Sequence, residues 1–383
     1  MLIVPFSLFS QEKTENIVIG ERLTIRSEIL AEERTVHVYL PEEYTSRSQR
    51  FPVLYVLDGA TYYYPALGAA KFLSDFDISS PMIIVAILNT DRTRDMTPTR
   101  IPRAQTSGGA DSFLKFIKDE LFALIERRYR TQPFRILLGH SAGGLLVFHT
   151  LLSQPEMFNG YIAISSSLWW DNEILLVKAK QFLEKTKEMN KFLYFSVEEG
   201  ESNHVKTNQE MEQLLKDKAP EGLEWQYDYA KNEDHESLWL RSFQKALKFI
   251  YRDYNISMDE VAKKGLDAVL GQYRKLSEKY GYKIEATERV LLHIGGYVSG
   301  GLKEYDKAIE ILNYCTKTYQ DSHEAFYILG LIYDAQDKLE LAQENFTRAL
   351  EIAKAKSDPS MKKYKTNLEE IQNKLKIIKC PSS

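Results

Sequence analysis

Residues 134–145 read FRILLGHSAGGL and combine an apolar run, a glycine-rich motif and the start of a helical pattern. The first five residues are mostly apolar and predict a strand, and a helical pattern begins at Leu145. Between the two lies Gly139–Gly143 (GHSAG), which has the spacing Gly-x-Ser-x-Gly. In this order the motif predicts a sharp turn that exposes the Ser141 hydroxyl above a sheet, because the glycines let strand and helix approach closely. No Gly-Lys-Ser/Thr sequence follows, so the stretch does not match a phosphate-binding loop.

Further strand-like runs lie before and after Phe134–Leu138 in the chain. Arg34–Leu40 alternates between apolar and polar residues, and Glu224–Tyr229 is strand-like. The others are continuous apolar runs, as expected for strands buried on both faces. The additional predicted strands are Arg34–Leu40, Pro52–Asp58, Met82–Leu88, Tyr161–Ser165, Phe192–Val197 and Glu224–Tyr229. Amphipathic helical patterns, such as Asp111–Arg128 and Leu145–Ser153, lie between them. This alternation predicts an α/β fold with a doubly wound, mostly parallel sheet.

The pattern changes after about Tyr254, and from Asp259 to Lys379 only helical patterns occur. Small and aromatic residues recur there with the offsets of a tetratricopeptide repeat, in which two antiparallel helices interlock. The residues are Phe326, Leu329, Gly330, Tyr333, Ala342, Phe346 and Ala349. A weaker copy, shifted back by the repeat length of about 34 residues, aligns Gly296 with Gly330 and Leu312 with Phe346. We therefore predict an all-α, tetratricopeptide-like tail, with an unrelated helical bundle as the alternative.

Length and composition limit the possible classes of protein. The 383 residues suggest more than one domain, which we place at 21–255 for the α/β part and 256–383 for the helical part, after a lead-in at 1–20. Lys and Arg total 50 against 54 Asp and Glu, so no basic excess predicts a nucleic-acid partner. Two cysteines, Cys315 and Cys380, are too few for a disulfide framework or a cysteine-rich metal site.

The N-terminal residues Met1–Ser10 are unusually apolar, and the charged stretch Gln11–Glu15 follows. No run approaches the roughly 20 apolar residues that a transmembrane helix needs, so no integral membrane segment is expected. The segment resembles the end of a secretory signal, although a basic start is missing. We favour a periplasmic or secreted location over a cytoplasmic one, with a frayed apolar terminus as the alternative.

A serine hydroxyl needs a histidine to act as its base, and the chain has seven histidines. Five of them fall in a predicted strand, beside the nucleophile, in the helix after it or in the tail: His37, His140, His149, His293 and His323. His204 and His235 remain. Only His235 follows a further strand, in the polar loop Lys231–Glu236 before the last helix of the α/β part. Because a hydrolase with the order serine, acid, histidine carries its base there, we predict His235 as the base. The alternative is a histidine of a surface loop.

The acid that orients the histidine should follow the strand Phe192–Val197. Three carboxylates compete for this role, and we rank Glu201 first, Glu199 second and Glu198 third. At least two of them are expected to belong to a solvated acidic turn.

The oxyanion of an ester's transition state needs two N–H donors. We assign them to Ala142, directly after the nucleophile, and to Gly59 or Ala60, after the strand Pro52–Asp58. Aromatic and polar residues near strand ends are candidates for the substrate pocket, although ordinary packing would explain them as well. They are His140, Ser167, Trp169, Trp170, Tyr62 and Arg92. The predicted chemistry needs no metal and no organic cofactor.

Six segments of the chain together resemble a known family. They are FPVLYVLDG at 51–59, NTDRTRDMTPT at 89–99, FIKDELFALIERRYR at 116–130, LLGHSAGG at 137–144, YIAISSSLWW at 161–170 and NEDHESLW at 232–239. The chain resembles the putative-esterase family of α/β-hydrolases from Arg22 to Tyr251, a family that includes enterochelin esterases and formylglutathione-hydrolase-like esterases. The resemblance implies an α/β-hydrolase fold and ester hydrolysis through Ser141 and His235. In the family the acid often lies three residues after a glycine that ends its strand. Glu198 occupies the position of that glycine here, so the resemblance implies Glu201, three residues later, as the first candidate for the acid.

The leading hypothesis is a serine hydrolase of carboxylic esters that acts on a small molecule. The resemblance implies substrates that range from siderophore lactones and thioesters to feruloyl or acetyl sugar esters. Two alternatives stay open: an interaction protein with a vestigial hydrolase domain, and an acyltransferase with the same triad. The helical tail would bind a peptide or protein partner or mediate self-association.

Overall fold

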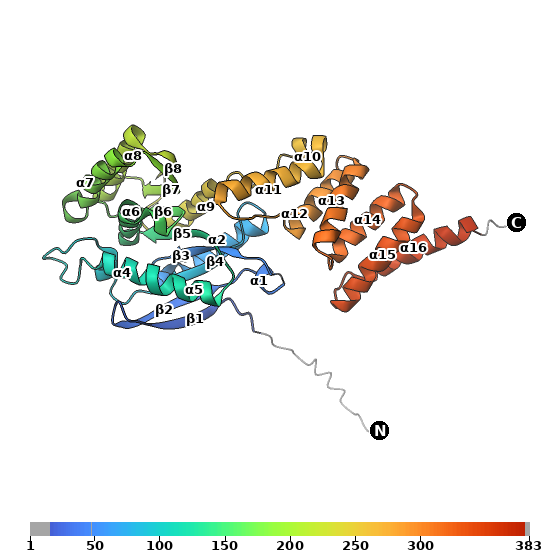
Figure 1. The fold of residues 1–383 in the computed structure, drawn as a ribbon, viewed down its shortest axis with the longest axis horizontal. Helices are drawn as coiled ribbons and strands as arrows, with labels where there is room; N and C mark the ends of the chain where they lie inside the picture. Colours follow the sequence, from blue (N-terminus) through green and yellow to red (C-terminus); the bar gives the residue numbers. More distant parts are fainter. Residues whose placement is uncertain (1–15, 47, 380–383) are drawn as a thin grey trace, which may run out of the picture. The chain divides into compact units, whose positions relative to one another are not determined.

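A computed structural model describes residues 16–46 and 48–379 (Figure 1). The apolar segment Met1–Ser10, on which the location was predicted, lies outside the described residues. Contacts divide the described chain into two compact units, one of residues 16–46, 48–73 and 81–250, the other of residues 74–80 and 251–379. The division follows Ile250, whereas the sequence pattern placed a boundary after residue 255.

The first unit contains an eight-stranded sheet with the order β1-β2-β4-β3-β5-β6-β7-β8. β2 is antiparallel to both of its neighbours, and the other neighbouring pairs are parallel. The strands are β1 (Glu21–Ser27), β2 (Glu32–Tyr39), β3 (Phe51–Val56), β4 (Ile83–Ile87), β5 (Thr131–His140), β6 (Gly160–Ile164), β7 (Glu188–Glu198) and β8 (Glu221–Ala230). The predicted α/β fold with a mostly parallel sheet is confirmed, because β3, β4 and β6 are buried along their whole length as their apolar runs require.

β1 was not predicted. Its side chains are exposed or half-buried up to the last residue, Ser27. It lies at the edge of the sheet and pairs with β2 alone. An edge strand with charged residues on its open face carries too weak an apolar signal to be recognised.

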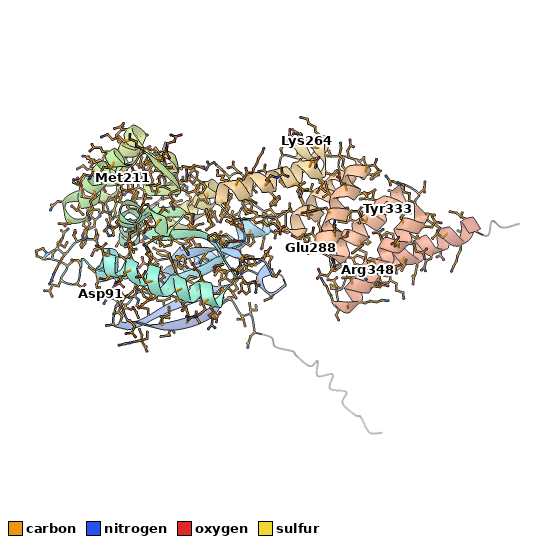
Figure 2. The ribbon with its side chains drawn as sticks, in the orientation of Figure 1. Asp91, Met211, Lys264, Glu288, Tyr333 and Arg348 are labelled. Atoms are coloured by element: carbon orange, nitrogen blue, oxygen red, sulfur yellow. The ribbon has the colours of Figure 1, made fainter. Side chains whose placement is uncertain are left out.

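Helices cover both faces of the sheet (Figure 1). They are α1 (Glu43–Ser46), α2 (Gly59–Asp75), α3 (Arg92–Met96), α4 (Ala110–Phe116), α5 (Phe122–Arg128), α6 (Ala142–Ser153), α7 (Trp170–Lys185), α8 (Asn203–Lys218) and α9 (Leu238–Ile250). On one face Tyr55 packs against Phe122 of α5, with ring centroids 4.9 Å apart. On the other face Tyr194 packs near Phe249 of α9, at 6.4 Å. Met211 of α8, labelled in Figure 2, belongs to the buried core of the first face.

The segment Asp111–Arg128, predicted as one helix, is interrupted by a π-helical turn at Ile117–Leu121. Glu120 lies in this turn and accepts hydrogen bonds from the Ser27 hydroxyl at 2.6 Å and from the amide of Glu28 at 3.0 Å. The turn thus ties the helix to the end of β1. π-helical turns cannot be distinguished from α-helix by apolar periodicity alone.

The second unit is helical over its C-terminal part. Its helices are α10 (Met258–Lys264), α11 (Leu266–Tyr280), α12 (Glu288–Gly300), α13 (Tyr305–Thr318), α14 (His323–Ala335), α15 (Leu339–Ala355) and α16 (Met361–Lys379). α14 and α15 approach closely at Gly330. A Cβ atom added to this glycine would lie 2.6 Å from the Phe346 ring, which leaves no room for a side chain. This interlock fits a tetratricopeptide repeat, which stays a prediction for the tail.

The alignment of the second copy was wrong by one residue. Gly295, rather than Gly296, faces Leu312 across the α12–α13 pair, where a Cβ atom would lie 2.8 Å from that side chain. A Cβ atom at Gly296 would meet nothing within 4 Å. The glycine and its partner are 17 residues apart in this pair and 16 apart in the Gly330–Phe346 pair, so a fixed repeat length misplaces the contact.

Gly330 and Gly296 form a matched pair of helical glycines. We expect Gly330→Ala to lower the free energy of unfolding by about 1–3 kcal/mol, because Phe346 must move to accommodate the methyl group. Gly296→Ala should raise it by up to about 1 kcal/mol through helix propensity alone. Urea unfolding followed by circular dichroism measures both. Equal effects of the two substitutions would contradict the close packing of α14 on α15.

Candidate active site

Ser141 occupies the turn between β5 and α6. Its backbone angles are φ 58° and ψ −114°, a strained conformation for a residue with a side chain. The glycines of the motif make this turn possible. A Cβ atom on Gly139 would collide with the backbone of Gly143, and one on Gly144 would collide with Ser166. The turn therefore has the geometry that exposes a nucleophilic hydroxyl at the end of a strand.

His235 and Glu198 are linked through a third side chain, Ser165. The Ser165 hydroxyl lies 2.5 Å from Glu198 Oε2 and 2.7 Å from His235 Nδ1, and the direct distance between that nitrogen and Glu198 Oε2 is 3.7 Å. An ionised carboxylate only accepts, so Ser165 donates to Glu198 and accepts the proton of His235 Nδ1. This chain leaves the Nε2 atom of His235 unprotonated, which is the tautomer that a general base requires.

The three candidate acids lie in different environments. Glu198 is buried, and it also accepts a hydrogen bond from the Ser202 hydroxyl. Glu199 accepts a hydrogen bond from the amide of Asn232 at 3.0 Å. Glu201 is exposed and forms no hydrogen bond or ion pair within the described part of the chain.

The geometry thus favours Glu198, which the sequence ranked last, over Glu201. The reason is the length of β7. The strand was predicted to end at Val197, but its ladder with β8 continues to the pair Glu198–Ala230. Glu198 itself therefore stands at the end of the strand.

Electrostatics keep Glu198 ionised. Burial raises the pKa of this carboxyl, but the interactions with His235 and Ser165 outweigh that effect and lower the pKa to about 2. The carboxylate is therefore charged throughout the range in which a histidine titrates, and it can stabilise a cationic His235.

Ser141 contacts a second chain of polar groups, which begins at Ser167. Its hydroxyl oxygen lies 3.3 Å from Ser167 Oγ, which lies 3.3 Å from His204 Nε2. Trp169 Nε1 donates to the same histidine nitrogen at 3.0 Å. Because an indole N–H only donates, Nε2 of His204 is an acceptor and the ring is neutral. Burial and the neighbouring His235 lower the pKa of His204, which agrees with that state.

A cavity of about 700 Å³ adjoins this chain. It is lined by Arg103, Trp169, Asn172, Glu173, Asn203 and His204. The guanidinium of Arg103 lies 5.8 Å from the centre of the Trp169 ring. Sequence reasoning did not identify Arg103 or His204 as pocket residues, although the position of His204 just after the acidic turn was a usable signal.

Trp170 and His140, both predicted to line the pocket, are instead buried. Trp170 packs in the core and donates from Nε1 to Thr99 Oγ1 at 3.1 Å. His140 has both ring nitrogens hydrogen-bonded, to Tyr62 at 2.8 Å and to the backbone of His235 at 2.7 Å. These side chains hold neighbouring segments rather than face a substrate.

Arg92, another predicted pocket residue, is bound to a carboxylate. Its Nε and Nη2 atoms donate to the two oxygens of Asp58 at 2.6 and 3.0 Å. Asp58 lies two residues after the end of β3 and has a φ of 54°. The pair fixes the turn from which α2 begins.

The candidate oxyanion donors lie at two helix starts. Ala142 is the first residue of α6, and Gly59 and Ala60 are the first residues of α2. The first N–H groups of a helix have no acceptor within the helix. A Cβ atom on Gly143 would lie 3.4 Å from Asp58 Oδ2, so the two helix starts are close. This arrangement fits the predicted oxyanion hole.

Glu198, His204 and His235 also have the composition of a metal site, with ligand atoms within 4.8 Å of one another. Two hydrogen bonds described above already use their nitrogens: His235 Nδ1 bonds Ser165, and His204 Nε2 bonds Trp169. A metal ion that bound through these two nitrogens would have to displace both hydrogen bonds.

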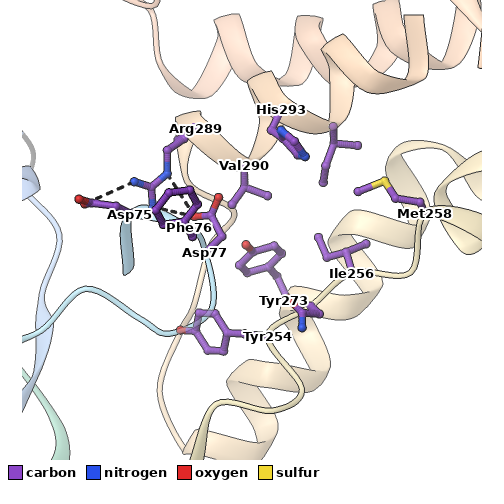
Figure 3. Close-up of a pocket in the computed structure, with 12 residues that line it drawn as sticks. Asp75, Phe76, Asp77, Tyr254, Ile256, Met258, Tyr273, Arg289, Val290 and His293 are labelled. Atoms are coloured by element: carbon purple, nitrogen blue, oxygen red, sulfur yellow. Dashed lines mark hydrogen bonds and ion pairs between the residues drawn. The ribbon is translucent and has the colours of Figure 1, made fainter. Parts of the chain in front are cut away.

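A separate cavity of about 290 Å³ lies within the second unit (Figure 3). Phe76, Tyr254 and Tyr273 contribute aromatic rings to it. Arg289, the cation at its edge, pairs with Asp77 at 2.8 Å and more weakly with Asp75. The described lining contains no serine beside a histidine, so this cavity does not carry the predicted chemistry.

Comparison with known proteins identifies the family. Residues 27–250, more than half of the chain, match the family model described as Putative esterase. The chain belongs to the putative esterase family. The ferri-bacillibactin esterase BesA of Bacillus subtilis (strain 168) is 28% identical over 249 residues, which are 57% of this chain and 85% of that protein. The siderophore triacetylfusarinine C esterase of Aspergillus fumigatus is 35% identical over 148 residues, 36% of this chain and 51% of that protein. The chain thus spans about half the length of this second relative.

Solved structures extend the likeness. An IroE-like serine hydrolase from Shewanella oneidensis has a TM-score of 0.70 at 27% identity, over 78% of this chain and 99% of that one. An uncharacterised protein from Capnocytophaga ochracea DSM 7271 has a TM-score of 0.62 at 16% identity over 92% of this chain and 99% of that one, a likeness of fold alone. The predicted family membership and esterase activity are confirmed: the chain is an esterase. No helix among residues 16–46 and 48–379 is long and apolar enough to cross a membrane.

The low pKa of Glu198 predicts how stability depends on pH. The carboxyl titrates near 4.5 when unperturbed and at about 2 in the folded protein, so its ionised form stabilises the fold above pH 4.5. That contribution is lost as the pH falls toward 2. On acidification from neutral pH to about pH 3, the wild type should therefore lose more stability than Glu198→Gln.

Urea midpoints at several pH values test this expectation. Glu201→Gln is the matched control, because Glu201 is exposed, and it should follow the wild type. If wild type and Glu198→Gln lost stability in parallel on acidification, Glu198 would not be the buried, charged partner of His235.

Proposed function

We propose that the chain hydrolyses siderophore-type carboxylic esters through a triad of Ser141, His235 and Glu198. The observation that carries this proposal is the hydrogen-bonded chain from Glu198 through Ser165 to His235 Nδ1, next to the strained turn of Ser141. It supplies an activated base, an orienting acid and an exposed nucleophile.

In the acylation step, Ser141 Oγ attacks the ester carbonyl carbon while His235 Nε2 takes the hydroxyl proton. The amides of Ala142 and of Gly59 or Ala60 would donate to the oxyanion. The cationic imidazole is stabilised by Glu198 through Ser165, which exchanges no proton with either. His235 then gives the proton to the leaving alcohol, and an acyl-enzyme on Ser141 remains.

In the deacylation step, His235 takes a proton from water, which attacks the acyl carbonyl. Collapse of the second tetrahedral intermediate returns the proton to Ser141 and releases the acid. Among the described residues Ser141 Oγ is hydrogen-bonded to Ser167 instead of His235. Catalytic hydrogen bonds are often long without substrate and tighten when it binds.

The relatives and the cavity support the substrate class. Two relatives are named as the siderophore triacetylfusarinine C esterase of Aspergillus fumigatus and the siderophore enterobactin esterase of Emericella nidulans. The cavity beside Ser167 combines an aromatic ring, Trp169, with one cation, Arg103, and one carboxylate, Glu173. An aromatic wall among polar groups suits a large ester that carries both aromatic and polar groups.

Ser141→Ala should reduce ester turnover by roughly 10³-fold or more, because the acyl-enzyme cannot form. A panel of an aryl ester, an acetylated sugar, a siderophore trilactone and a thioester measures this loss and ranks the substrates. We expect the trilactone to have the highest kcat/KM. A Ser141→Ala variant that stays folded and active would rule out the mechanism.

Two further measurements on the wild-type protein distinguish the proposed function from its two rivals. A vestigial hydrolase domain would leave Ser141 unlabelled by a fluorophosphonate, whereas we expect labelling at Ser141 alone. An acyltransferase would direct the acyl group to an added alcohol or amine in preference to water, whereas we expect the free acid as the main product. A peptide partner or self-association of the helical tail stays a separate proposal.

Glu198→Gln and Glu201→Gln separate the candidate acids. Glu198→Gln should lower kcat by about 10²–10⁴-fold, because a neutral amide cannot stabilise the cationic His235. Glu201→Gln should keep nearly the wild-type kcat, because this side chain is exposed. Steady-state kinetics on the best ester of the panel measures both. The opposite ranking would restore Glu201 as the acid.

A further inference from the structure

The loop that carries the base, residues 231–237, is held by several hydrogen bonds. Of residues 231–237, Glu233 and His235 are half-buried and the others are exposed. Within the loop, the side chain of Asp234 accepts from the amides of Glu236 at 3.0 Å and Ser237 at 2.7 Å. The amide of Asn232 binds Glu199 and the ring of His235 binds Ser165, so these two bonds hold the loop to the ends of β7 and β6. None of these bonds reaches the nucleophile turn at residues 139–143.

His140 supplies an anchor from the nucleophile turn. It is 3% exposed, and its Nε2 lies 2.7 Å from the carbonyl oxygen of His235. A carbonyl only accepts, so Nε2 must carry the proton and donate it. The other nitrogen, Nδ1, is then an acceptor, and the hydroxyl of Tyr62 donates to it at 2.8 Å. The hydrogen bonds therefore fix one tautomer of His140.

Tyr62 holds the same loop at a second point. Its ring stacks on Trp239, with centroids 4.6 Å apart and an angle of 3° between the planes. Trp239 is buried and lies at the start of α9, four residues after His235. Tyr62 of α2 thus contacts Trp239, just after the loop, directly, and it contacts His235, within the loop, through His140.

The surroundings of His140 favour its neutral form. The charged and titratable groups that face it are Asp58 from the end of β3, Arg92 from α3, Tyr62 from α2 and His235 itself. Burial and the proximity of His235 lower the pKa of His140 to about 4. A neutral neighbour does not repel the positive charge that His235 takes up in the reaction.

We propose that His140 and Tyr62 are positioning residues that clamp the His235 loop onto the nucleophile turn and thereby set the base within reach of Ser141. This proposal rests on the proposed function for its kinetic consequence. It gives a role to the variable residue of the Gly-x-Ser-x-Gly motif, which the reaction itself does not use. Displacement of a catalytic group by about 1 Å can cost a rate factor of about 10².

The kinetic test compares two neighbouring tyrosines. Tyr62→Phe should lower kcat by about 3- to 10-fold and leave KM within about twofold, because one positioning hydrogen bond is lost. Tyr64→Phe is the matched control, since this neighbour on α2 is 60% exposed, and it should match the wild type. A loss of equal size in both variants, or a change in KM alone, would overturn the proposal.

Replacements of His140 should form a graded series. His140→Gln retains an N–H donor for the carbonyl of His235 and should keep more of kcat than His140→Ala. His149→Gln tests whether loss of any buried histidine has the same effect, because His149 is also 3% exposed but bonds Asp111 instead. If His149→Gln lowered kcat as much as His140→Ala, or if His140→Gln showed no rescue, the effect would be general destabilisation.

A readout without turnover separates the clamp from the proposed function. In Ser141→Ala protein, amide hydrogen exchange of residues 231–237 should be faster with Tyr62→Phe than with Tyr64→Phe. The ring nitrogens of His140 should give the NMR signals of an Nε2-protonated, neutral imidazole between about pH 5 and 8. Equal exchange in both variants, or an Nδ1-protonated ring, would overturn the clamp even in an active esterase. Both expected results in a protein that hydrolyses no ester would uphold the clamp and reject the proposed function.

Discussion

The rest of the site depends on the close approach of two glycines in one strained turn. Ser141 can adopt its positive φ because Gly139 has no side chain that would collide with the backbone of Gly143, and Gly144 has none that would collide with Ser166. This turn brings the hydroxyl to the carboxyl end of β5, and β6 and β7 end beside it. Parallel neighbours end at the same edge, so Ser165 and Glu198 reach the same place from distant parts of the chain.

Two neutral histidines lie beside His235, the base of the proposed mechanism. Hydrogen bonds assign the proton to a single nitrogen in each of His140 and His204, and their lowered pKa values keep both uncharged at neutral pH. His235 is thus the histidine whose positive charge is balanced, through Ser165, by the ionised Glu198. In the proposed mechanism the proton transfer would therefore pass through His235 alone, because neither neighbouring histidine holds a stable positive charge.

The sequence predicted the parts of the fold that have strong local signals. Buried parallel strands are continuous apolar runs, and the nucleophile motif has fixed spacing, so both were recognised. The edge strand β1 was missed because it is only half-buried. Glu198 was ranked below Glu201 because the end of β7 depends on pairing with β8, which a single strand does not reveal. The contacts of Ser165, just after β6, depend on the neighbouring strand β7 and have no local pattern. His204, at the start of α8, had only its position after the acidic turn as a signal.

The most direct measurement of the central claim is a double-mutant cycle on His235 and Glu198. The rate of Ser141 labelling by a fluorophosphonate would be compared for His235→Ala, Glu198→Gln and the double variant. If Glu198 acts only by orienting His235 and stabilising its positive charge, removing Glu198 should have no further effect once His235 is absent. The labelling rate of the double variant should then equal that of His235→Ala alone. Independent effects that multiply in the double variant would show that the two residues do not act as one unit, and would contradict the account.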